Sequence, residues 1–129
     1  MLNVFDRSAS WQSEARSVLR IATGLLFLQH GTQKILSFPT APGFELQTIH
    51  VTAGWIELIG GILFILGLFT RPVAFILCGF AAVAYWMVHG PQDFFPILNQ
   101  GELAALYCFV FLYFIAAGAG TWSLDERMR

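Results

Sequence analysis

The residue that most strongly suggests chemistry is Glu57, a carboxylate inside the otherwise apolar run Val51–Phe69. A carboxylate at the centre of a membrane-spanning helix costs about 2.5–3.5 kcal/mol on insertion scales. Ionisable groups placed there commonly mark substrate or proton pathways. Glu57 is therefore the first candidate for a ligand-binding or proton-relay residue.

Five other polar residues are expected near the depth of Glu57, in the outer half of the protein. They are His30, Gln33, Lys34, His89 and Glu102. We expect Lys34 to pair with Glu57, because two unpaired charges at this depth would both be costly. The alternatives are that Lys34 snorkels to the lipid headgroups and that His89 is an interfacial residue without a role. Glu102 has the alternative of only completing a helix cap that begins at Asn99.

The types and spacing of these residues favour binding of a small molecule over metal or hydrolytic chemistry. The histidines and carboxylates lack His-x-x-His or Glu-x-x-His spacing, and Lys34 would repel a cation. No nucleophile lies beside a base, as hydrolysis would require. Lys34 and His30 can instead donate hydrogen bonds to a neutral or anionic ligand, while Glu57 orients it or accepts a proton. Three aromatic residues offer a flat apolar wall suited to a quinone-like ring: Phe27, Tyr85 and Trp86.

The composition indicates a membrane protein with one domain. Of its 129 residues, 57% are hydrophobic and only 12% are charged, and the net charge is -1. A soluble domain would carry about 25% charged residues. The lack of a basic face argues against a nucleic-acid partner and leaves the lipid bilayer as the main surroundings. The first apolar stretch begins near Ile21 without a cleavage site after it, so we expect it to remain in the mature protein.

Four apolar segments, separated by loops that contain proline or glycine, predict four membrane-spanning helices. Their expected ranges are about 17–36, 51–69, 72–89 and 102–121. Each approaches the ~20 residues that a bilayer core requires, and a helix satisfies its backbone hydrogen bonds internally. The predicted fold class is an all-α integral membrane four-helix bundle that spans residues 1–129 as one domain.

The distribution of arginine predicts the orientation of these helices. Six arginines fall in segments that share one side if both termini lie there: Arg7, Arg16, Arg20, Arg71, Arg127 and Arg129. The opposite loops contain Glu45 and Asp93 but no lysine or arginine. By the positive-inside rule both termini are cytoplasmic. On that side, Arg20 and Asp125 are expected to form a structural ion pair.

The two cysteines, Cys78 and Cys108, are interpreted as small buried hydrophobic residues. They match no CxxC or zinc spacing. Counting from opposite ends of antiparallel helices places them about 10 Å apart in depth at ~1.5 Å per residue, whereas a disulfide needs Cα atoms within ~7 Å. The sequence therefore predicts no disulfide.

Glycines recur at intervals of seven residues in the first two segments. Gly24 and Gly31 form one such pair, and Gly54 and Gly61 form another. Small residues at this spacing let helix backbones approach closely. We expect them to pack the bundle internally, with a homo-oligomer face as the alternative.

An ordered set of motifs runs through nearly the whole chain, from about residue 16 to residue 125. Its elements are Arg20 with Gly24, Phe27 and His30-Gly31-x-x-Lys34; Glu57-x-x-Gly60-Gly61 followed by Gly67-x-x-Thr70-Arg71; His89; and Asn99-x-x-Glu102 with Gly118-x-Gly120-x-x-Ser123-Leu124-Asp125. This set resembles the DoxX family of small bacterial membrane proteins. The resemblance implies a four-helix inner-membrane protein associated with redox or oxidative-stress systems, as in the thiosulfate:quinone oxidoreductase subunit that gave the family its name. It implies no catalytic residue.

Three hypotheses for the function follow. The first is an accessory, non-catalytic subunit of a quinone-linked oxidoreductase, which binds a quinone or sulfur compound in the outer half and works with a separate redox enzyme. No haem or CxxC motif is present through which the chain would carry electrons alone. The second is a structural or assembly subunit without a ligand. The third is a small proton-coupled carrier, against which the lack of an internal repeat argues.

Overall fold

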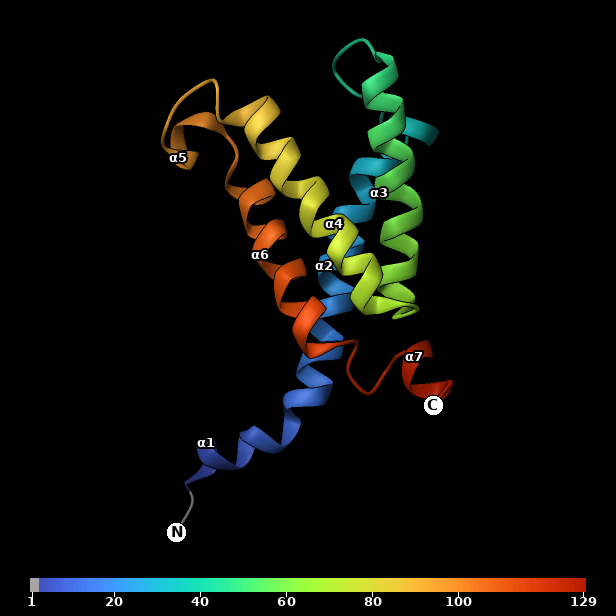
Figure 1. Cartoon of the computed structure of the whole chain (residues 1–129), viewed down its shortest axis with the longest axis vertical. Helices are drawn as coiled ribbons and strands as arrows, with labels where there is room; N and C mark the ends of the chain where they lie inside the picture. Colours follow the sequence, from blue (N-terminus) through green and yellow to red (C-terminus); the bar gives the residue numbers. More distant parts are fainter. Residues whose placement is uncertain (1–2) are drawn as a thin grey trace.

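The chain folds as a set of helices joined by loops, as the computed structural model shows for residues 3–129 (Figure 1). No β-strand occurs in these residues, so the predicted all-α class is confirmed. The elements in chain order are α1 (Val4–Arg7), the 3-10 helix η1 (Ser8–Trp11), α2 (Gln12–Leu36), α3 (Thr48–Leu66), α4 (Thr70–Ala84), the π-helical turn η2 (Tyr85–His89), α5 (Pro96–Asn99), α6 (Glu102–Ala117) and α7 (Leu124–Arg127).

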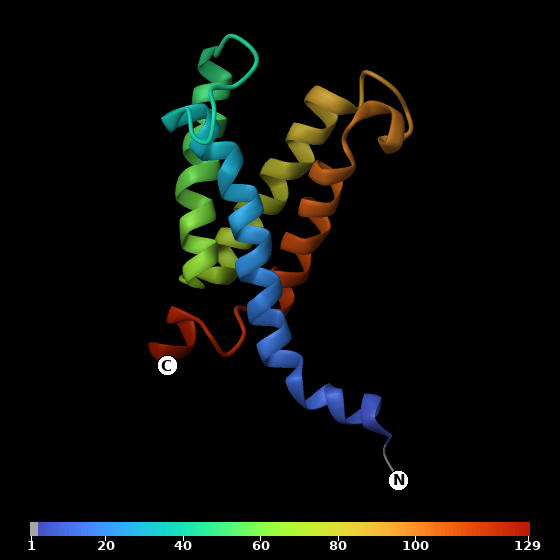
Figure 2. The same cartoon turned by 180° about the vertical axis from the view of Figure 1, so that it is seen from behind.

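The long helices associate as two pairs. Helix α2 packs along α3, and α4 packs along α6, with far fewer contacts between the pairs. Both chain ends lie at one end of the molecule, which we call the termini end, and the loops 37–47 and 90–101 lie at the other, the loop end (Figures 1 and 2). The two pairs meet near the termini end and diverge toward the loop end, as both views show.

Several helix ends differ from the expected ranges for a local backbone reason. Helix α3 stops at Leu66 because Gly67 adopts a left-handed conformation with φ of 66°. Helix α6 stops at Ala117, where Gly118 has φ of 76°, and so ends four residues before the predicted Thr121. The αL conformation of Gly67 is a usual way to end a helix, whereas Gly118, with ψ of -171°, leaves the helix in an extended conformation with positive φ that glycine adopts readily. As a result, α6 is shorter than the sequence suggested.

The start of α6 corrects a second expectation. Gly101, not Asn99, is the N-cap residue of α6, and no side chain caps that helix. Asn99 ends α5 instead, is fully buried, and uses its side chain to join three segments. Its Nδ2 donates to the Tyr85 hydroxyl and to the Asp93 carbonyl, both at 3.0 Å, while its Oδ1 accepts from the Gly101 amide at 2.8 Å. Asn99 thus fixes the loop before α6 rather than the helix itself.

The core where the helices meet is built from aromatic rings packed edge to face. Phe64 and Phe111 are fully buried with centroids 5.1 Å apart, and Phe27 lies 5.1 Å from Phe111 in the same geometry. Phe64 also meets Phe114 at 5.0 Å. Such pairs add about 0.5–1.5 kcal/mol each beyond the burial of their area. This cluster joins α2, α3 and α6 and keeps the two helix pairs together.

The outer surface of the helices is strongly apolar. Exposed positions include large hydrophobic side chains on every long helix, among them Leu25, Leu26, Ile59, Ile62, Phe75, Ile76, Leu106, Phe109 and Leu112. Within the described chain, Thr48–Leu66 and Thr70–His89 are long and apolar enough to cross a membrane, and Glu102–Ala117 is apolar but shorter. A soluble protein rarely exposes apolar patches of this extent.

The two cysteines lie in contact, which contradicts the predicted separation in depth. The Sγ atoms of Cys78 and Cys108 are 3.8 Å apart across the interface of α4 and α6, and both thiols are free. Cys78 lies eight residues after Thr70, and Cys108 lies nine residues before Ala117, the end of α6 at the same end of the molecule. The prediction was wrong because it placed the end of α6 four residues too late.

Candidate ligand cavity at the loop end

A cavity of about 690 Å³ lies where the two helix pairs diverge. All the long helices contribute to its wall, together with loop residues Phe44 and Gln100. Most of the lining is aliphatic or aromatic, and the polar groups are few. A largely apolar wall with a few convergent polar groups is typical of a small-molecule site. We call this space the loop-end cavity.

An ion pair forms one wall of this cavity. Lys34 on α2 donates through Nζ to both carboxylate oxygens of Glu57 on α3, at 2.9 and 2.7 Å. Both side chains are largely buried, with 16% and 8% of their surface exposed. The pairing that the sequence predicted is therefore present. The pair satisfies both charges where the protein covers most of each side chain.

Two glycines bring α2 and α3 close enough for this pair to form. A Cβ on Gly31 would lie 2.5 Å from the backbone nitrogen of Leu58, and a Cβ on Gly54 would lie 2.9 Å from the Cβ of Lys34. Real Cβ atoms do not approach other atoms so closely, so only glycine fits at either position. These contacts set the register in which Lys34 reaches Glu57 across the interface.

The inner wall of the cavity carries His30 and Tyr107. Their rings are 6.0 Å apart and perpendicular, and Phe27 lies 5.3 Å from the Tyr107 ring. Tyr107 is 94% buried, since only 6% of its surface is exposed. Its hydroxyl has no hydrogen-bond partner among residues 3–129. A buried hydroxyl without a partner costs free energy, so it is a donor ready for a ligand acceptor.

Two further histidines border the cavity at its outer rim. His89 lies in the π-helical turn η2, and its Nδ1 is 3.0 Å from the carbonyl oxygen of Asn99. π-Helical turns are rare and often occur at functional sites. His50, in the first turn of α3, accepts a hydrogen bond from the Gln47 amide and packs on Phe44. Each histidine has one ring nitrogen free of these contacts.

The structure brings together four of the six predicted site residues. Glu57, Lys34, His30 and His89 line the cavity. Glu102 is exposed, and neither Glu102 nor Gln33 belongs to the lining. Of the predicted aromatic wall, Phe27 is in place, whereas Tyr85 and Trp86 do not line the cavity.

Sequence reasoning missed Tyr107, Phe80 and His50, which do line the cavity. One signal for Tyr107 was available. Tyr107, Phe111 and Phe114 are spaced by four and three residues, so they share one face of α6, and all three are buried. That face was identifiable as the core face, although the whole segment is so apolar that no face stands out by polarity.

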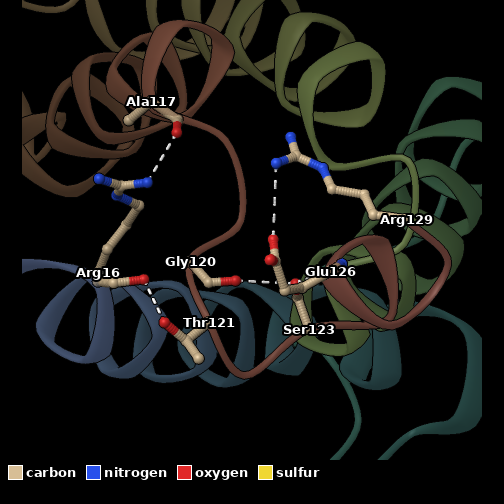
Figure 3. Close-up of polar contacts among 8 residues, drawn as sticks. Arg16, Ala117, Gly120, Thr121, Ser123, Glu126 and Arg129 are labelled. Carbon is tan, nitrogen blue, oxygen red and sulfur yellow. Dashed lines mark hydrogen bonds and ion pairs between the residues drawn. The ribbon is translucent and has the colours of Figure 1, made fainter.

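The termini end is organised differently, around buried arginines. Arg20 is fully buried, and its guanidinium donates to the carbonyl oxygens of Ala119, of Trp122 at 2.5 Å and of Ile65 at 3.3 Å. Arg16 donates to the carbonyl of Ala117 at 2.9 Å, as Figure 3 shows. Arginine side chains therefore satisfy the backbone where α6 ends and the chain turns back.

Arg20 does not pair directly with Asp125, contrary to the prediction. Within the described residues the two groups are not at ion-pair distance, and the Asp125 carboxylate instead accepts the backbone amides of Phe69 and Thr70 at 2.7 and 2.9 Å. Burial alone would raise the pKa of Asp125, but the hydrogen bonds from Thr70 and Phe69, with the nearby Arg20 charge, outweigh it and hold that pKa below its ordinary value. Asp125 thus caps α4 rather than neutralising Arg20.

A second, smaller cavity of about 470 Å³ lies beside this junction. Figure 3 shows Arg16 and Ala117 on one side of it and the exposed pair Glu126 and Arg129, 3.8 Å apart, on the other. Its polar groups are mostly engaged with the protein itself, as in the contact between Ser123 and the Gly120 carbonyl at 2.9 Å. The loop-end cavity is therefore the better candidate for a ligand.

Comparison with known proteins confirms the resemblance to the DoxX family. The sequence pattern of the DoxX family matches residues 15–90, more than half of the chain, from α2 through η2. A Haemophilus influenzae protein described as uncharacterized is 47% identical over 116 residues, which covers 84% of this chain and 87% of that protein. No solved structure matches the chain. The matched region contains the ion pair as well as His30 and His89.

Proposed function

This chain belongs to the DoxX family, whose members are membrane-associated, and from that premise we propose that it binds a quinone-like ring in the loop-end cavity of a four-helix inner-membrane protein. The proposal has two parts: the placement of the chain in the membrane and the nature of the ligand. Each part rests on different residues.

The membrane placement is supported by the surface of the helices and by the arginines. Helices α3 and α4 with η2 are of spanning length, and α2 and α6 expose the same kind of apolar side chains beside them. The arginines outside the apolar segments gather at the termini end, where Arg16, Arg71 and Arg129 border the smaller cavity. These helices make the chain a multi-pass protein. By the positive-inside rule the termini end is cytoplasmic, so the loop-end cavity opens toward the periplasmic side.

The ligand class follows from the buried hydroxyl of Tyr107, the single observation that carries the proposal. A quinone ring is flat and apolar, and its two carbonyl oxygens accept hydrogen bonds. In the cavity, Tyr107 and His30 can donate to one carbonyl, while Phe27 and Phe80 provide aromatic surfaces for the ring. The volume of about 690 Å³ lies in the range of sites for small organic molecules.

In the proposed role the protein is an accessory subunit of a redox or oxidative-stress system. The Lys34–Glu57 pair would hold the wall of the site and offer a proton acceptor near the bound ring. A separate redox enzyme would exchange electrons with the ligand, since the sequence has no haem or CxxC motif. The accessory role itself is tested by whether deletion of the gene and the Tyr107 variant share one quinone-linked phenotype.

The binding test uses a photoreactive azidoquinone and the protein in lipid nanodiscs. Light should attach the probe to peptides of α2 and α6 that line the cavity, and excess ubiquinone analogue should prevent it. Tyr107→Phe removes one hydrogen bond worth ~1 kcal/mol, so we expect about fivefold weaker labelling. Tyr113→Phe is the matched control, because Tyr113 lies on the same helix but is 46% exposed and outside the cavity. Equal labelling of both variants would contradict the proposal.

A structural role without a ligand is the second candidate, and the geometry of the ion pair favours it. Lys34 contacts both oxygens of Glu57, so each charge is satisfied without any ligand. A purely structural pair predicts that Glu57→Gln lowers the amount of folded protein but leaves labelling per folded molecule unchanged. Glu102→Gln, an exposed acid outside the cavity, is the control for loss of a carboxylate as such.

A further inference from the structure

The only two cysteines of the chain lie in contact, although thirty residues separate them in sequence. Cys78 on α4 and Cys108 on α6 have Sγ atoms 3.8 Å apart, and each side chain is half-buried. A disulfide bond has an S–S length of ~2.05 Å, so the sulfurs need to approach by less than ~2 Å. Because α4 and α6 pack closely along their length, side-chain rotation with a small helix adjustment is enough.

The surroundings of the pair restrict which oxidants can reach it. Both cysteines lie near the middle of apolar helices, next to hydrophobic residues such as Leu77, which is buried, and Phe109, which is exposed. Water-soluble thiols and disulfides do not reach the pair through the lipid. A redox partner that arrives by that route therefore has to be soluble in lipid and able to take two electrons.

The loop-end cavity begins about one helical turn from each sulfur. Ala81, three residues after Cys78, and Ala104, four residues before Cys108, both line the cavity. Residues three or four apart are neighbours on one side of a helix. An oxidant could therefore arrive either from the surrounding lipid or from the cavity.

We infer that Cys78 and Cys108 form a redox-active dithiol, which a membrane-dissolved quinone oxidises to a disulfide that links α4 to α6. Both S–H bonds break and one S–S bond forms. The two electrons and two protons pass to the quinone, whose carbonyl groups become the hydroxyl groups of the quinol. The inference rests on the membrane placement proposed above but does not require that the cavity itself holds the quinone.

The experiment uses the full-length protein in nanodiscs, reduced and then kept without oxygen. The probe is decylubiquinone, whose fully substituted ring cannot add to a thiol. After acid quenching, remaining thiols are alkylated with a maleimide and the intact mass is measured. We expect the wild-type chain to lose two hydrogens and both alkylation sites, with one quinol formed per chain.

Two variants separate this chemistry from other oxidation. Cys78→Ser and Cys108→Ser should each keep one alkylatable thiol and form no quinol. A wild-type chain that keeps both thiols, or that forms disulfides only between chains, overturns the inference. The deciding measurement is the loss of thiols and the formation of quinol in the wild-type chain. Poor folding of a serine variant therefore does not change the conclusion.

The Tyr107→Phe variant distinguishes the two sources of quinone. An unchanged oxidation rate in that variant supports delivery from the lipid, and a severalfold slower rate supports delivery from the cavity. If azidoquinone labelling fails but the disulfide forms normally, the proposed quinone site in the cavity is wrong and the redox-active dithiol is supported. If labelling is normal but both thiols stay free, the quinone site is supported and the dithiol inference is wrong.

Discussion

At the termini end, Arg20 is fully buried and donates to backbone carbonyls of two different segments. At the loop end, Lys34 and Glu57 are buried against each other between α2 and α3. The first arrangement joins the chain after α6 to both α2 and α3, and so closes the gap between the helix pairs. The Lys34–Glu57 ion pair lies within one helix pair, α2 with α3, and beside it that pair diverges from α4 and α6.

The difference shows how the placement of a buried charge decides whether a cavity forms. A guanidinium has five N–H donors in a fixed plane, so it can bind carbonyls on several segments at once. Lys34 directs two of its three N–H donors to the Glu57 carboxylate, and no hydrogen bond among the described residues links this pair to a third helix. The termini end is therefore expected to be the rigid part of the molecule, and the loop end the part that adapts to a ligand.

The largest effect is expected from Arg20→Met. This change removes three hydrogen bonds from a charged guanidinium: the one to Ala119 is buried, and those to Ile65 and Trp122 are part-buried. Hydrogen bonds to charged groups contribute ~1.5–3 kcal/mol each, so we expect a loss of at least ~4 kcal/mol in the free energy of unfolding, a large share of the whole. Folded yield in detergent measures it. The exposed Arg7→Met is the control, and equal yields would mean that Arg20 does not hold the junction.

At the loop end, the single and double variants of the ion pair should differ. Glu57→Gln leaves the Lys34 charge without its partner; because 16% of that side chain is exposed, we expect the cost to stay below the ~3–5 kcal/mol of a fully buried pair. The double variant Lys34→Met with Glu57→Leu removes both charges and should recover most of the folded yield. If the double variant folds but no longer binds the azidoquinone, the pair serves the ligand as well as the fold. A double variant less stable than Glu57→Gln would contradict this account.

The contact between α2 and α3 can be tested at Gly31. An alanine there places its Cβ 2.5 Å from a backbone atom of Leu58, so the helices must move apart. Overpacking of this kind costs ~1–3 kcal/mol. Gly79→Ala on α4 is the matched control, because a Cβ at that position meets no atom within 4 Å. Thermal unfolding in detergent should show a lower midpoint for Gly31→Ala alone.

The smallest effect is expected from Asp125→Ala, which removes the cap of α4. Loss of such a cap costs ~0.5–2 kcal/mol. Since the native pKa of Asp125 lies below its ordinary value of 3.8, its contribution is present above pH 3.8 and is lost as the pH falls through the lower native pKa. The stability difference between wild type and Asp125→Ala should therefore shrink in acid.

The neighbouring acid Glu126 provides the control for this pH dependence. It is exposed, and its ion-pair partner among residues 3–129 is Arg129, at 3.8 Å. Surface pairs of this kind contribute little to stability. A constant difference between wild type and Asp125→Ala across the acidic range would show that the carboxylate charge is not what stabilises the cap.

Much of the helical arrangement followed from the sequence, because long apolar runs leave helix as the only way to satisfy the backbone in lipid. The pairing of Lys34 with Glu57 followed from the cost of isolated charges at equal depth. The ends of the helices could not be predicted to the residue. Helix α6 ends before Gly118, which has a positive φ, and the apolar residues that follow in the sequence gave no sign of this end.

That error of four residues explains the wrong prediction for the two cysteines. It placed Cys78 and Cys108 at different depths, although the structure puts their sulfurs in contact. The divergence of the two helix pairs could not be predicted from the sequence either, because it depends on contacts between distant segments and not on any local pattern. Without that divergence, nothing in the sequence indicated that Tyr107 would face a cavity.

In the proposed membrane placement, the short length of α6 has a consequence for the surrounding lipid. Its 16 residues span only ~24 Å at 1.5 Å per residue, whereas a bilayer core is ~30 Å thick. A spanning helix with such a deficit makes the adjacent acyl chains compress, at a fraction of a kcal/mol per Å of mismatch. Lipids with shorter acyl chains should therefore collect beside α6. The folded protein should be more stable in a thin bilayer than in a thick one.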